Sequence, residues 1–339
     1  GILLFLGNDE SPMNYEDNPF DFRQDSSFLY FFGLDLPGLA AIIDIDQGRE
    51  IIFGDDISVE MTVWMGPQQP LMEKCELAGI KELLPYSKLQ DYVDQAKSKK
   101  IHFLPPYRAD QTLMLSELLK LAPAQVAERV SRALIDAVVD QRSIKSDEEV
   151  AEIEKALVIC AAMFQAATAA RLENQRPPAI AGRMAAIAAS RGSAWSFAPI
   201  LTPHGDILHG GLHPDPLQDG DLLVVDVGAE SPEGYASDIT RTLPVVGRFD
   251  SRQRELYTIV LEAQRTAIDA IAPGKRFLDI HREAATIICR GLKEIGLMRG
   301  DVDEAVAEGA HALFFPHGLG HMLGLDAHDM EALGEDAVG

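Results

Sequence analysis

The chain has 339 residues, of which 47% are hydrophobic and 24% are charged. This length exceeds a single typical core and indicates two domains of ordinary globular composition. The formal net charge of −23 argues against nucleic acid and the membrane surface as partners, because both are anionic. No apolar run in the sequence reaches the roughly 18 residues that a membrane span needs.

The three cysteines, Cys75, Cys160 and Cys289, are odd in number and far apart along the chain. Such spacing is typical of free thiols in a reducing compartment, so we expect a cytoplasmic protein without a disulfide framework. The chain starts at Gly1 without a methionine and stops at Gly339 in a loop-like stretch, which favours a fragment of a longer polypeptide.

Residues 1–143 alternate short apolar runs with helical patterns. We expect strands at Ile2–Leu6, Ala40–Ile45, Glu50–Phe53 and Ile101–Phe103. We expect helices at Met72–Leu77, Leu89–Lys97 and Thr112–Leu121. This order predicts an α/β domain with a mixed sheet, and the sequence contains no phosphate loop of the GxGxxG or GxxxxGK type. The aromatic residues between Phe22 and Gly38 are expected to pack in the core or to form a surface for a partner subunit.

The second predicted domain comprises residues 144–339. Ser146 and Glu149 form a capping box, which predicts the start of a helix that continues to about Leu172. Pro177 and Pro178 break this helix.

A second, alanine-rich helix is expected at Ala179–Ser190. The order of helix, proline break, helix and strand then recurs, with helices predicted at Arg252–Ile271 and Phe277–Ile295. The recurrence suggests a domain of two similar halves with a site at their shared centre.

The stretch from Asp221 to Pro244 is the centre of this domain. A buried strand is predicted at Leu222–Val225 and ends in Asp226, and Asp238 lies in a second strand-like run. Glycine and proline between the two runs predict a hairpin, which would point both carboxylates at one place. Two carboxylates forced together repel each other, so a cation between them is expected. This stretch alone also permits two solvated turn aspartates.

Seven of the nine histidines fall in two short windows, at 204–213 and 311–328. In the later window the glycines around His317 and His321 make a zinc-binding HExxH helix improbable, and with His328 the cluster favours a site. In the earlier window His209 is predicted to point at the site, whereas His204 and His213 lie beside prolines in surface turns.

Two carboxylates and an imidazole are ligands that suit Mn, Fe, Co or Zn. This set argues against a structural site built from thiolates. A metal pair sharing Asp238 would polarise a carbonyl and lower the pKa of a bridging water, giving hydroxide at neutral pH. Nearby histidines could hold the carbonyl oxygen. The predicted chemistry is metal-assisted hydrolysis of an amide.

Three motifs, ILHGG, GYASDITRTLP and HGLGHMLGLDAHD, resemble those of the pita-bread metallopeptidases, the creatinase/methionine-aminopeptidase superfamily. FRQDSSFLYFFG resembles the N-terminal domain of the aminopeptidase P (Xaa-Pro aminopeptidase) subgroup. The resemblance implies a creatinase-like α/β domain at 1–143 and an α+β pita-bread catalytic domain, incomplete at its C-terminal end, at 144–339. It implies an enzyme that removes an N-terminal residue preceding proline, acting on peptides with proline in the second position.

The resemblance also implies residue roles and a centre of two divalent metal ions, most often Mn(II). Asp226 resembles the ligand of one metal, Asp238 the bridging aspartate and His321 the imidazole ligand. His209 corresponds to a histidine near the scissile bond, and His328 to one that stabilises the carbonyl oxygen.

In the same way His317 resembles the histidine that lines the proline pocket, and Thr240 a partner of the ligands. The family's two glutamate ligands, one of them the general base, come after the last histidine motif, so we expect them beyond residue 339. Glu331 and Glu335 follow His328 too closely to take these roles. The resemblance further implies a homo-oligomer.

Other functions remain open at this stage. A prolidase, which cleaves only Xaa-Pro dipeptides, would share the fold and the ligands. A pita-bread domain that only binds a partner, or a creatinase-like C–N hydrolase without metal, would not require Asp226, Asp238 and His321 together.

Overall fold

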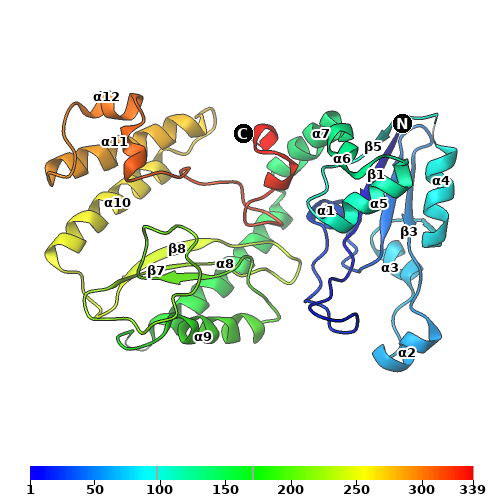
Figure 1. Cartoon of the computed structure of the whole chain (residues 1–339), viewed down its shortest axis with the longest axis horizontal. Coiled ribbons are helices and arrows are strands. Elements are labelled where there is room, and N and C mark those ends of the chain that lie inside the picture. Colours follow the sequence, from blue (N-terminus) through cyan, green and yellow to red (C-terminus); the bar gives the residue numbers. More distant parts are fainter. Residues whose placement is uncertain (97, 170–171, 339) are drawn as a thin grey trace. The chain divides into compact units, whose positions relative to one another are not determined.

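The structure is a computed structural model and describes residues 1–96, 98–169 and 172–338. The chain forms two compact units, one of residues 1–145 with 330–339 and one of residues 146–329 (Figure 1). The sequence-based boundary assigned residues 330–339 to the second domain, whereas the structure groups them with the first. The reason lies in contacts within the first unit, where Arg132 forms an ion pair with Asp336 at 2.7 Å.

The first unit is built on a five-stranded mixed sheet with the strand order β4-β3-β2-β1-β5. The strands are β1 Ile2–Leu6, β2 Ala40–Asp44, β3 Arg49–Phe53, β4 Glu82–Leu84 and β5 Ile101–His102. The central pairs β1–β2 and β2–β3 are antiparallel, and the outer strands β4 and β5 pair in parallel. The mixed sheet is therefore confirmed, with β4 as an additional strand.

Eight α-helices of the described residues belong to this unit. They are α1 Ser26–Phe32, α2 Val59–Met65, α3 Leu71–Leu77, α4 Leu89–Gln95, α5 Ala109–Leu119, α6 Pro123–Val126, α7 Arg132–Ser143 and α13 Glu335–Val338. The expected helices correspond to α3, α4 and α5; residue 97, at the end of one of them, lies outside the described residues. The aromatic stretch forms α1, in which Phe28 and Phe32 are buried and Tyr30 and Phe31 are half-buried.

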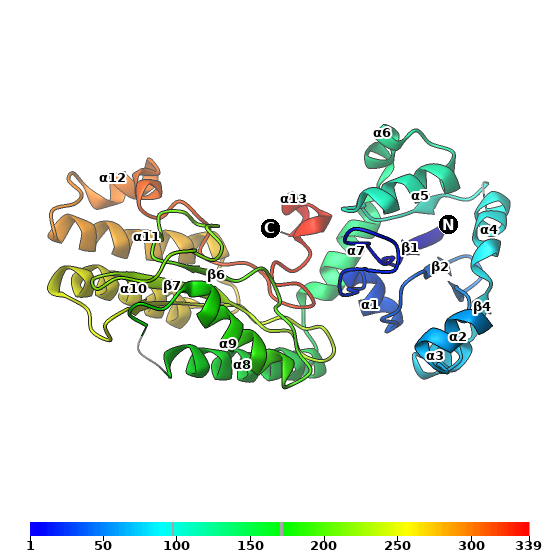
Figure 2. The ribbon, with the colours of Figure 1, turned by 60° about the horizontal axis from the view of Figure 1, so that its bottom comes forward.

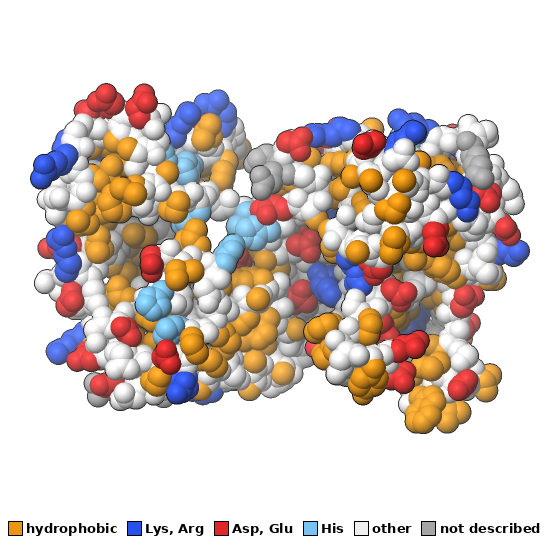
Figure 3. All heavy atoms as spheres, viewed as in Figure 1, with side chains coloured by type: hydrophobic (Ala, Val, Ile, Leu, Met, Phe, Trp, Pro, Cys, Tyr) orange, Lys and Arg blue, Asp and Glu red, His pale blue; other side chains and the backbone are white. Residues whose placement is uncertain are grey.

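Helix α2 contributes no side chain to the core. Val59, Val63 and Trp64 are 86%, 80% and 78% exposed, and hydrophobic side chains gather at its position in the space-filling view (Figure 3). A cluster of large apolar side chains left open to water is unusual for a monomer and is typical of an interaction surface.

The second unit begins with two helices, α8 Asp147–Thr168 and α9 Pro177–Ala189. The predicted capping box is present, since the Ser146 side chain accepts a hydrogen bond from the backbone N–H of Glu149. The two prolines occupy the first turn of α9 rather than an open break. A proline is tolerated there because the first N–H groups of a helix have no intrahelical partner.

These helices cover one face of a three-stranded antiparallel sheet with the order β6-β7-β8 (Figures 1 and 2). The strands are β6 Ile200–Thr202, β7 Leu222–Val227 and β8 Ile239–Pro244. Met163 of α8, Met184 of α9 and Leu223 of β7 are fully buried in the core between the helices and the sheet. The sheet therefore has one packed face and one face available for a site.

The remaining helices are α10 Ser251–Ala270, α11 Phe277–Glu294 and α12 Val302–Ala307. Helices α10 and α11 agree with the predicted second helix pair and share a small core that includes Ala263 and Ala284. The strand that the internal repeat predicts after α11 does not occur in residues 295–338, which form short helices and irregular turns. The predicted recurrence is therefore present for the helix pair α10 and α11, but not for the strand that should follow it.

We predict that Leu223→Ala lowers the free energy of unfolding of the second unit by about 2–5 kcal/mol, because it leaves a cavity under β7. The neighbouring Leu222→Ala is the control, since Leu222 is only half-buried on the opposite face. Urea denaturation of both variants measures the difference. Equal losses would contradict the assignment of the packed face.

Candidate metal centre

Asp226 belongs to the open face of the sheet. Along β7 every second residue is buried, and Leu223, Val225 and Val227 have no exposed surface. Because side chains alternate across a strand, Asp226 points away from this core. The strand continues through Asp226 to Val227, so the carboxylate lies within the strand and not at its end as the sequence suggested.

Asp238 reaches the same face from the adjacent strand. It directly precedes β8, in which Thr240 is the cross-strand partner of Asp226. Asp238 is two residues from Thr240 and therefore diagonal to Asp226 on one face of the antiparallel pair. The hairpin register thus brings the two carboxylates together, as the spacing predicted.

Gly228 allows the two arms of the hairpin to approach each other closely at this point. A Cβ atom at Gly228 would lie 1.8 Å from the carbonyl oxygen of Ser237 and 2.1 Å from Oγ of Ser196. No larger side chain fits there. The turn itself is made further along, where Gly234 adopts a positive φ of 83° and its N–H donates to the carbonyl oxygen of Ser231 at 2.9 Å. Gly228 therefore provides close approach, and Gly234 provides the turn.

The environment of Asp226 disfavours its charged form. Partial burial raises the pKa of this carboxyl above its ordinary value, and the neighbouring Asp238 raises it further by repulsion. Two groups oppose the rise: Thr240, whose Oγ1 donates to Asp226 Oδ1 at 2.7 Å, and the imidazole of His209. The balance leaves an acid that is harder to ionise than a free aspartate, which a bound cation would reverse.

His321 adds an imidazole to the two carboxylates. Its Nε2 lies 3.2 Å from Oδ2 of Asp238. The ring of His328 stacks on that of His321, with centroids 3.9 Å apart and planes 12° from parallel. The irregular segment after η3 (Ala310–Leu313) therefore brings two of its histidines to the open face of the hairpin.

The earlier histidine window lies between β6 and β7. His209 lies in an exposed turn, close enough to Asp226 to influence its pKa. The rings of His204 and His213 meet edge to face at 5.1 Å. His204 and His213 thus contact each other, and the assignment of His209 to the site stays a prediction.

His317 has a different surrounding, beside α11. Its ring meets Phe315 edge to face at 4.8 Å, and Phe315 stacks on His281 at 5.1 Å. His281 also lies 5.7 Å from the ring of His311, and burial followed by these neighbouring imidazoles lowers the pKa of His281. Sequence reasoning missed His281, because a single histidine in a helical pattern carries no signal of its own.

The donor groups suit a divalent cation by their chemistry. Two carboxylates and an imidazole match hard and borderline metals, and a cation between the aspartates would remove the repulsion that raises the pKa of Asp226. Within residues 1–96, 98–169 and 172–338, no three His, Cys, Asp or Glu side chains converge as a ready-made ligand set. Here Asp238 is paired with His321 itself.

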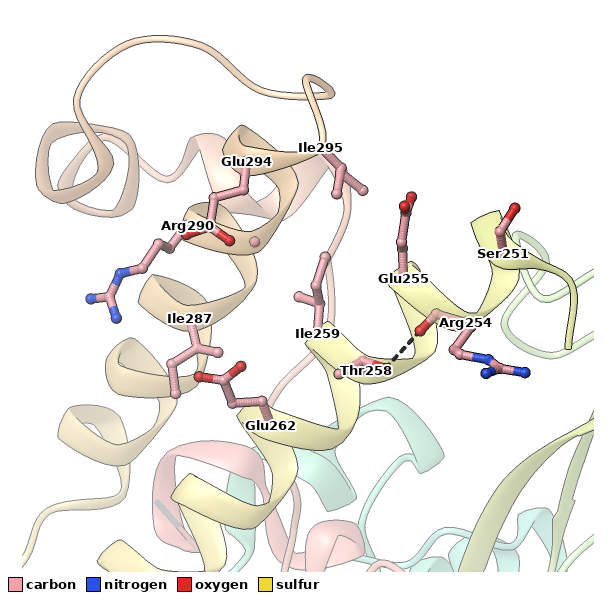
Figure 4. Close-up of a pocket in the computed structure, with 11 residues that line it drawn as sticks. Ser251, Arg254, Glu255, Thr258, Ile259, Glu262, Ile287, Arg290, Glu294 and Ile295 are labelled. Carbon is pink, nitrogen blue, oxygen red and sulfur yellow. Dashed lines mark hydrogen bonds between the residues drawn. The ribbon is translucent and has the colours of Figure 1, made fainter.

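A groove elsewhere in the second unit is lined by none of the residues of the candidate centre. It lies between α10 and α11 and has a volume of about 740 Å³ (Figure 4). Ile259, Ile287 and Ile295 contribute its apolar surface, and Arg254 and Arg290 point away from each other at its two sides. None of the histidines or aspartates described above lines it, so it is separate from the candidate centre.

Paired aspartates on adjacent strands, approached by histidines from a distant segment, define a metallohydrolase type of site. Residues 151–337 match metallopeptidase family M24, and residues 1–103 match the aminopeptidase P N-terminal domain. A probable Xaa-Pro aminopeptidase of Chaetomium globosum is 32% identical over 97% of this chain, which spans 55% of that relative. The Xaa-Pro aminopeptidase of Escherichia coli K12 is 32% identical over 94% of this chain and 75% of its own length.

A solved structure of E. coli aminopeptidase P, zinc-substituted and in complex with product, has the same fold. Its TM-score to this chain is 0.86 at 28% identity, covering 99% of this chain and 79% of the other. The chain belongs to metallopeptidase family M24, in the group that carries the aminopeptidase P N-terminal domain. This confirms the predicted order of a creatinase-like α/β domain and a pita-bread domain, and a divalent-metal centre follows from the family.

No helix in the part of the chain that the structure describes is both long enough and apolar enough to cross a membrane.

We predict that Asp226→Asn raises the free energy of unfolding at pH 7 in the presence of a chelator. The folded-state pKa of Asp226 is raised, so its ionised form destabilises the fold above that pKa. The advantage of the variant should shrink as the pH falls through the folded-state pKa towards the ordinary carboxyl value of about 3.9. Urea denaturation from pH 4 to 7 measures it.

Asp303→Asn, which replaces an exposed carboxylate on α12, is the matched control and should change little. A variant at Asp226 that is less stable than the parent at pH 7 would contradict this account of the charge pair.

Proposed function

We propose that the protein is a metal-dependent aminopeptidase that removes an N-terminal residue preceding proline and works with two divalent manganese ions. The observation that carries the proposal is the carboxylate pair Asp226 and Asp238 on one sheet face, with Nε2 of His321 at 3.2 Å from Asp238. Relatives at 30–32% identity are named Xaa-Pro aminopeptidases or probable Xaa-Pro aminopeptidases, which supports the same chemistry.

In this proposal Asp226 would hold one metal, Asp238 would bridge both, and His321 would hold the other. When bound, the metal ions supply a Lewis acid for the peptide carbonyl and lower the pKa of a water at neutral pH. Thr240 fixes the direction of the Asp226 carboxylate through its hydrogen bond at 2.7 Å. Such a partner orients a ligand and limits its freedom before the metal arrives.

The histidines around the pair have separate tasks in the proposal. His328, stacked on His321, would donate a hydrogen bond to the substrate carbonyl oxygen and to the oxyanion that develops from it. His209, in its exposed turn near Asp226, would contact the scissile bond. His317 would line the pocket for the proline ring, together with the apolar surface of Phe315 that it already touches.

The preference for proline follows from the bond itself. The peptide nitrogen before proline carries no hydrogen, and the ring restricts the conformation of the preceding residue. A general peptidase that binds this N–H loses a hydrogen bond to its substrate. A pocket shaped for the proline ring gains an apolar contact with that ring instead. A prolidase, restricted to dipeptides, would use the same ligands, and the rate on Xaa-Pro dipeptides against longer Xaa-Pro peptides separates the two.

A pita-bread module that only binds a partner is the second class of function. Such a module would need neither carboxylate of the pair and no imidazole beside it, whereas Asp226, Asp238 and His321 are all present. Metal content after purification separates the two classes.

We predict that Asp238→Ala abolishes manganese binding and Xaa-Pro hydrolysis in a longer polypeptide that also carries the two glutamate ligands that the family resemblance implies. Loss of a bridging ligand should reduce affinity by more than the roughly 10- to 100-fold that loss of a ligand's hydrogen-bond partner costs. Isothermal titration with manganese and a peptidase assay measure both. Asp303→Ala serves as control, and a fully active Asp238→Ala variant would contradict the proposal.

The 339-residue polypeptide supplies three of the five ligands that the family resemblance implies. We predict that it binds manganese weakly and hydrolyses Xaa-Pro peptides negligibly. A chimera in which the C-terminal part of the E. coli relative follows Gly339 should recover both properties. Equal binding and equal activity of the two polypeptides would contradict the expectation that two glutamate ligands follow residue 339.

We further propose a homo-oligomer in which α2 contributes to the interface. The exposed side chains of Val59, Val63 and Trp64 support this, because interfaces between identical subunits are more apolar than the rest of a protein surface. Changing Val63 and Trp64 to serine should shift sedimentation towards the monomer. Met13→Ser, at an apolar side chain that is 52% exposed elsewhere in the unit, is the control.

A further inference from the structure

Residues 321–329, here called the histidine loop, close on themselves through the backbone. The N–H of Asp329 donates to the carbonyl oxygen of Met322 at 3.1 Å, and the N–H of Gly324 donates to that of Asp326 at 3.1 Å. His321 and His328 each directly precede one end of the first of these bonds. Closure of the loop at Met322 and Asp329 therefore brings the two imidazoles into the observed stack.

The side chain of Asp329 fills the inside of this loop. It is 1% exposed, although it carries a carboxylate. A Cβ atom at Gly324 would lie 2.4 Å from its Oδ2 and 3.0 Å from its Oδ1, so the carboxylate rests directly on the glycine backbone. Oδ1 also accepts a hydrogen bond from the N–H of Asp326 at 3.4 Å. A buried carboxylate is stable only where donors meet it, so this arrangement defines one loop conformation.

The loop is also attached to the strands that carry the aspartates. The N–H of Ala236, two residues before Asp238, donates to the carbonyl oxygen of Gly324 at 2.7 Å. The glycine that makes room for Asp329 is thus the same residue that binds the hairpin. The opposite end of the loop reaches Asp238 through Nε2 of His321 at 3.2 Å.

We propose that Asp329 is a positioning residue, which fills the histidine loop against Gly324 and thereby sets the His321–His328 stack on Asp238. Only the expected effect on metal binding rests on the proposed function. The stacking of the two rings is a property of the metal-free chain and can be measured without activity.

The first test is histidine NMR on the 339-residue polypeptide with a chelator present. Two rings stacked at 3.9 Å shift each other's proton resonances, and His321→Asn and His328→Asn assign the signals. We expect Asp329→Ala to remove this ring-current shift and Asp329→Asn, which keeps the shape and an acceptor oxygen, to retain most of it. Asp303→Ala should leave it unchanged. An unaltered shift in a folded Asp329→Ala variant would overturn the inference.

A second pair of variants keeps the test decisive if Asp329→Ala alters the fold more widely. Gly324→Ala should lose the ring-current shift as well, because its methyl group collides with the Asp329 carboxylate. In the double variant Gly324→Ala/Asp329→Ala the collision is gone, so the loss of stability should be smaller than the sum of the two single losses. Additive losses would overturn the proposed contact.

Manganese added to the same samples tests whether Asp329 affects metal binding at His321. The ion should broaden the His321 resonance in the parent chain, and about 10- to 100-fold more manganese should be needed in Asp329→Ala, the usual effect of removing a residue that orients a ligand. Equal broadening in the two would overturn the positioning role. Absence of broadening in both the parent and the chimera with the C-terminal part of the E. coli relative would count against the proposed function, while the ring-current shift would still decide the inference.

Discussion

The structure of the second unit depends on the position of two carboxylates that repel each other. Asp226 and Asp238 lie on one face because the register of β7 and β8 is set by the apolar face beneath them, where Leu223, Val225 and Val227 are completely buried. A shift of one residue would expose that face to water, so the core enforces the juxtaposition. Folding thus supplies the energy that holds an electrostatically unfavourable pair ready for a cation.

The imidazole partner is held by a different kind of constraint. His321 comes from a segment without regular structure, which no strand register or helix period fixes. Its position follows from backbone hydrogen bonds within residues 321–329, the filled interior at Asp329 and one bond to the hairpin at Ala236. The centre therefore combines a rigid half, built on the sheet, with a half held by local polar contacts.

This division explains how far the sequence alone could lead. The apolar run Leu222–Val225 and the turn residues after Asp226 predicted a hairpin that brings Asp226 and Asp238 together, because a sheet converts spacing into geometry. The same stretch alone also permitted two solvated turn aspartates. The glycine-rich segment has no such period, so the clustering of its histidines favoured a site but their separate roles came only from the resemblance. His281 and Asp329 gave no signal. The strand expected after α11 does not form for a related reason: an apolar run predicts a strand only where a neighbouring strand pairs with it, and the apolar run after α11, at residues 313–315, begins at the last residue of the 3-10 helix Ala310–Leu313.

Gly228 has a consequence for how such a centre could change. With the carbonyl oxygen of Ser237 only 1.8 Å from where its Cβ would be, the separation of the two acidic residues is set by main-chain contact, not by their own side chains. Exchanging one metal for another of different radius can then be accommodated only through rotation of the carboxylates. The main chain of the hairpin would stay unchanged, and the choice of metal ion would depend on the side chains around it. Adaptation to a new metal would therefore begin with substitutions of these surrounding side chains.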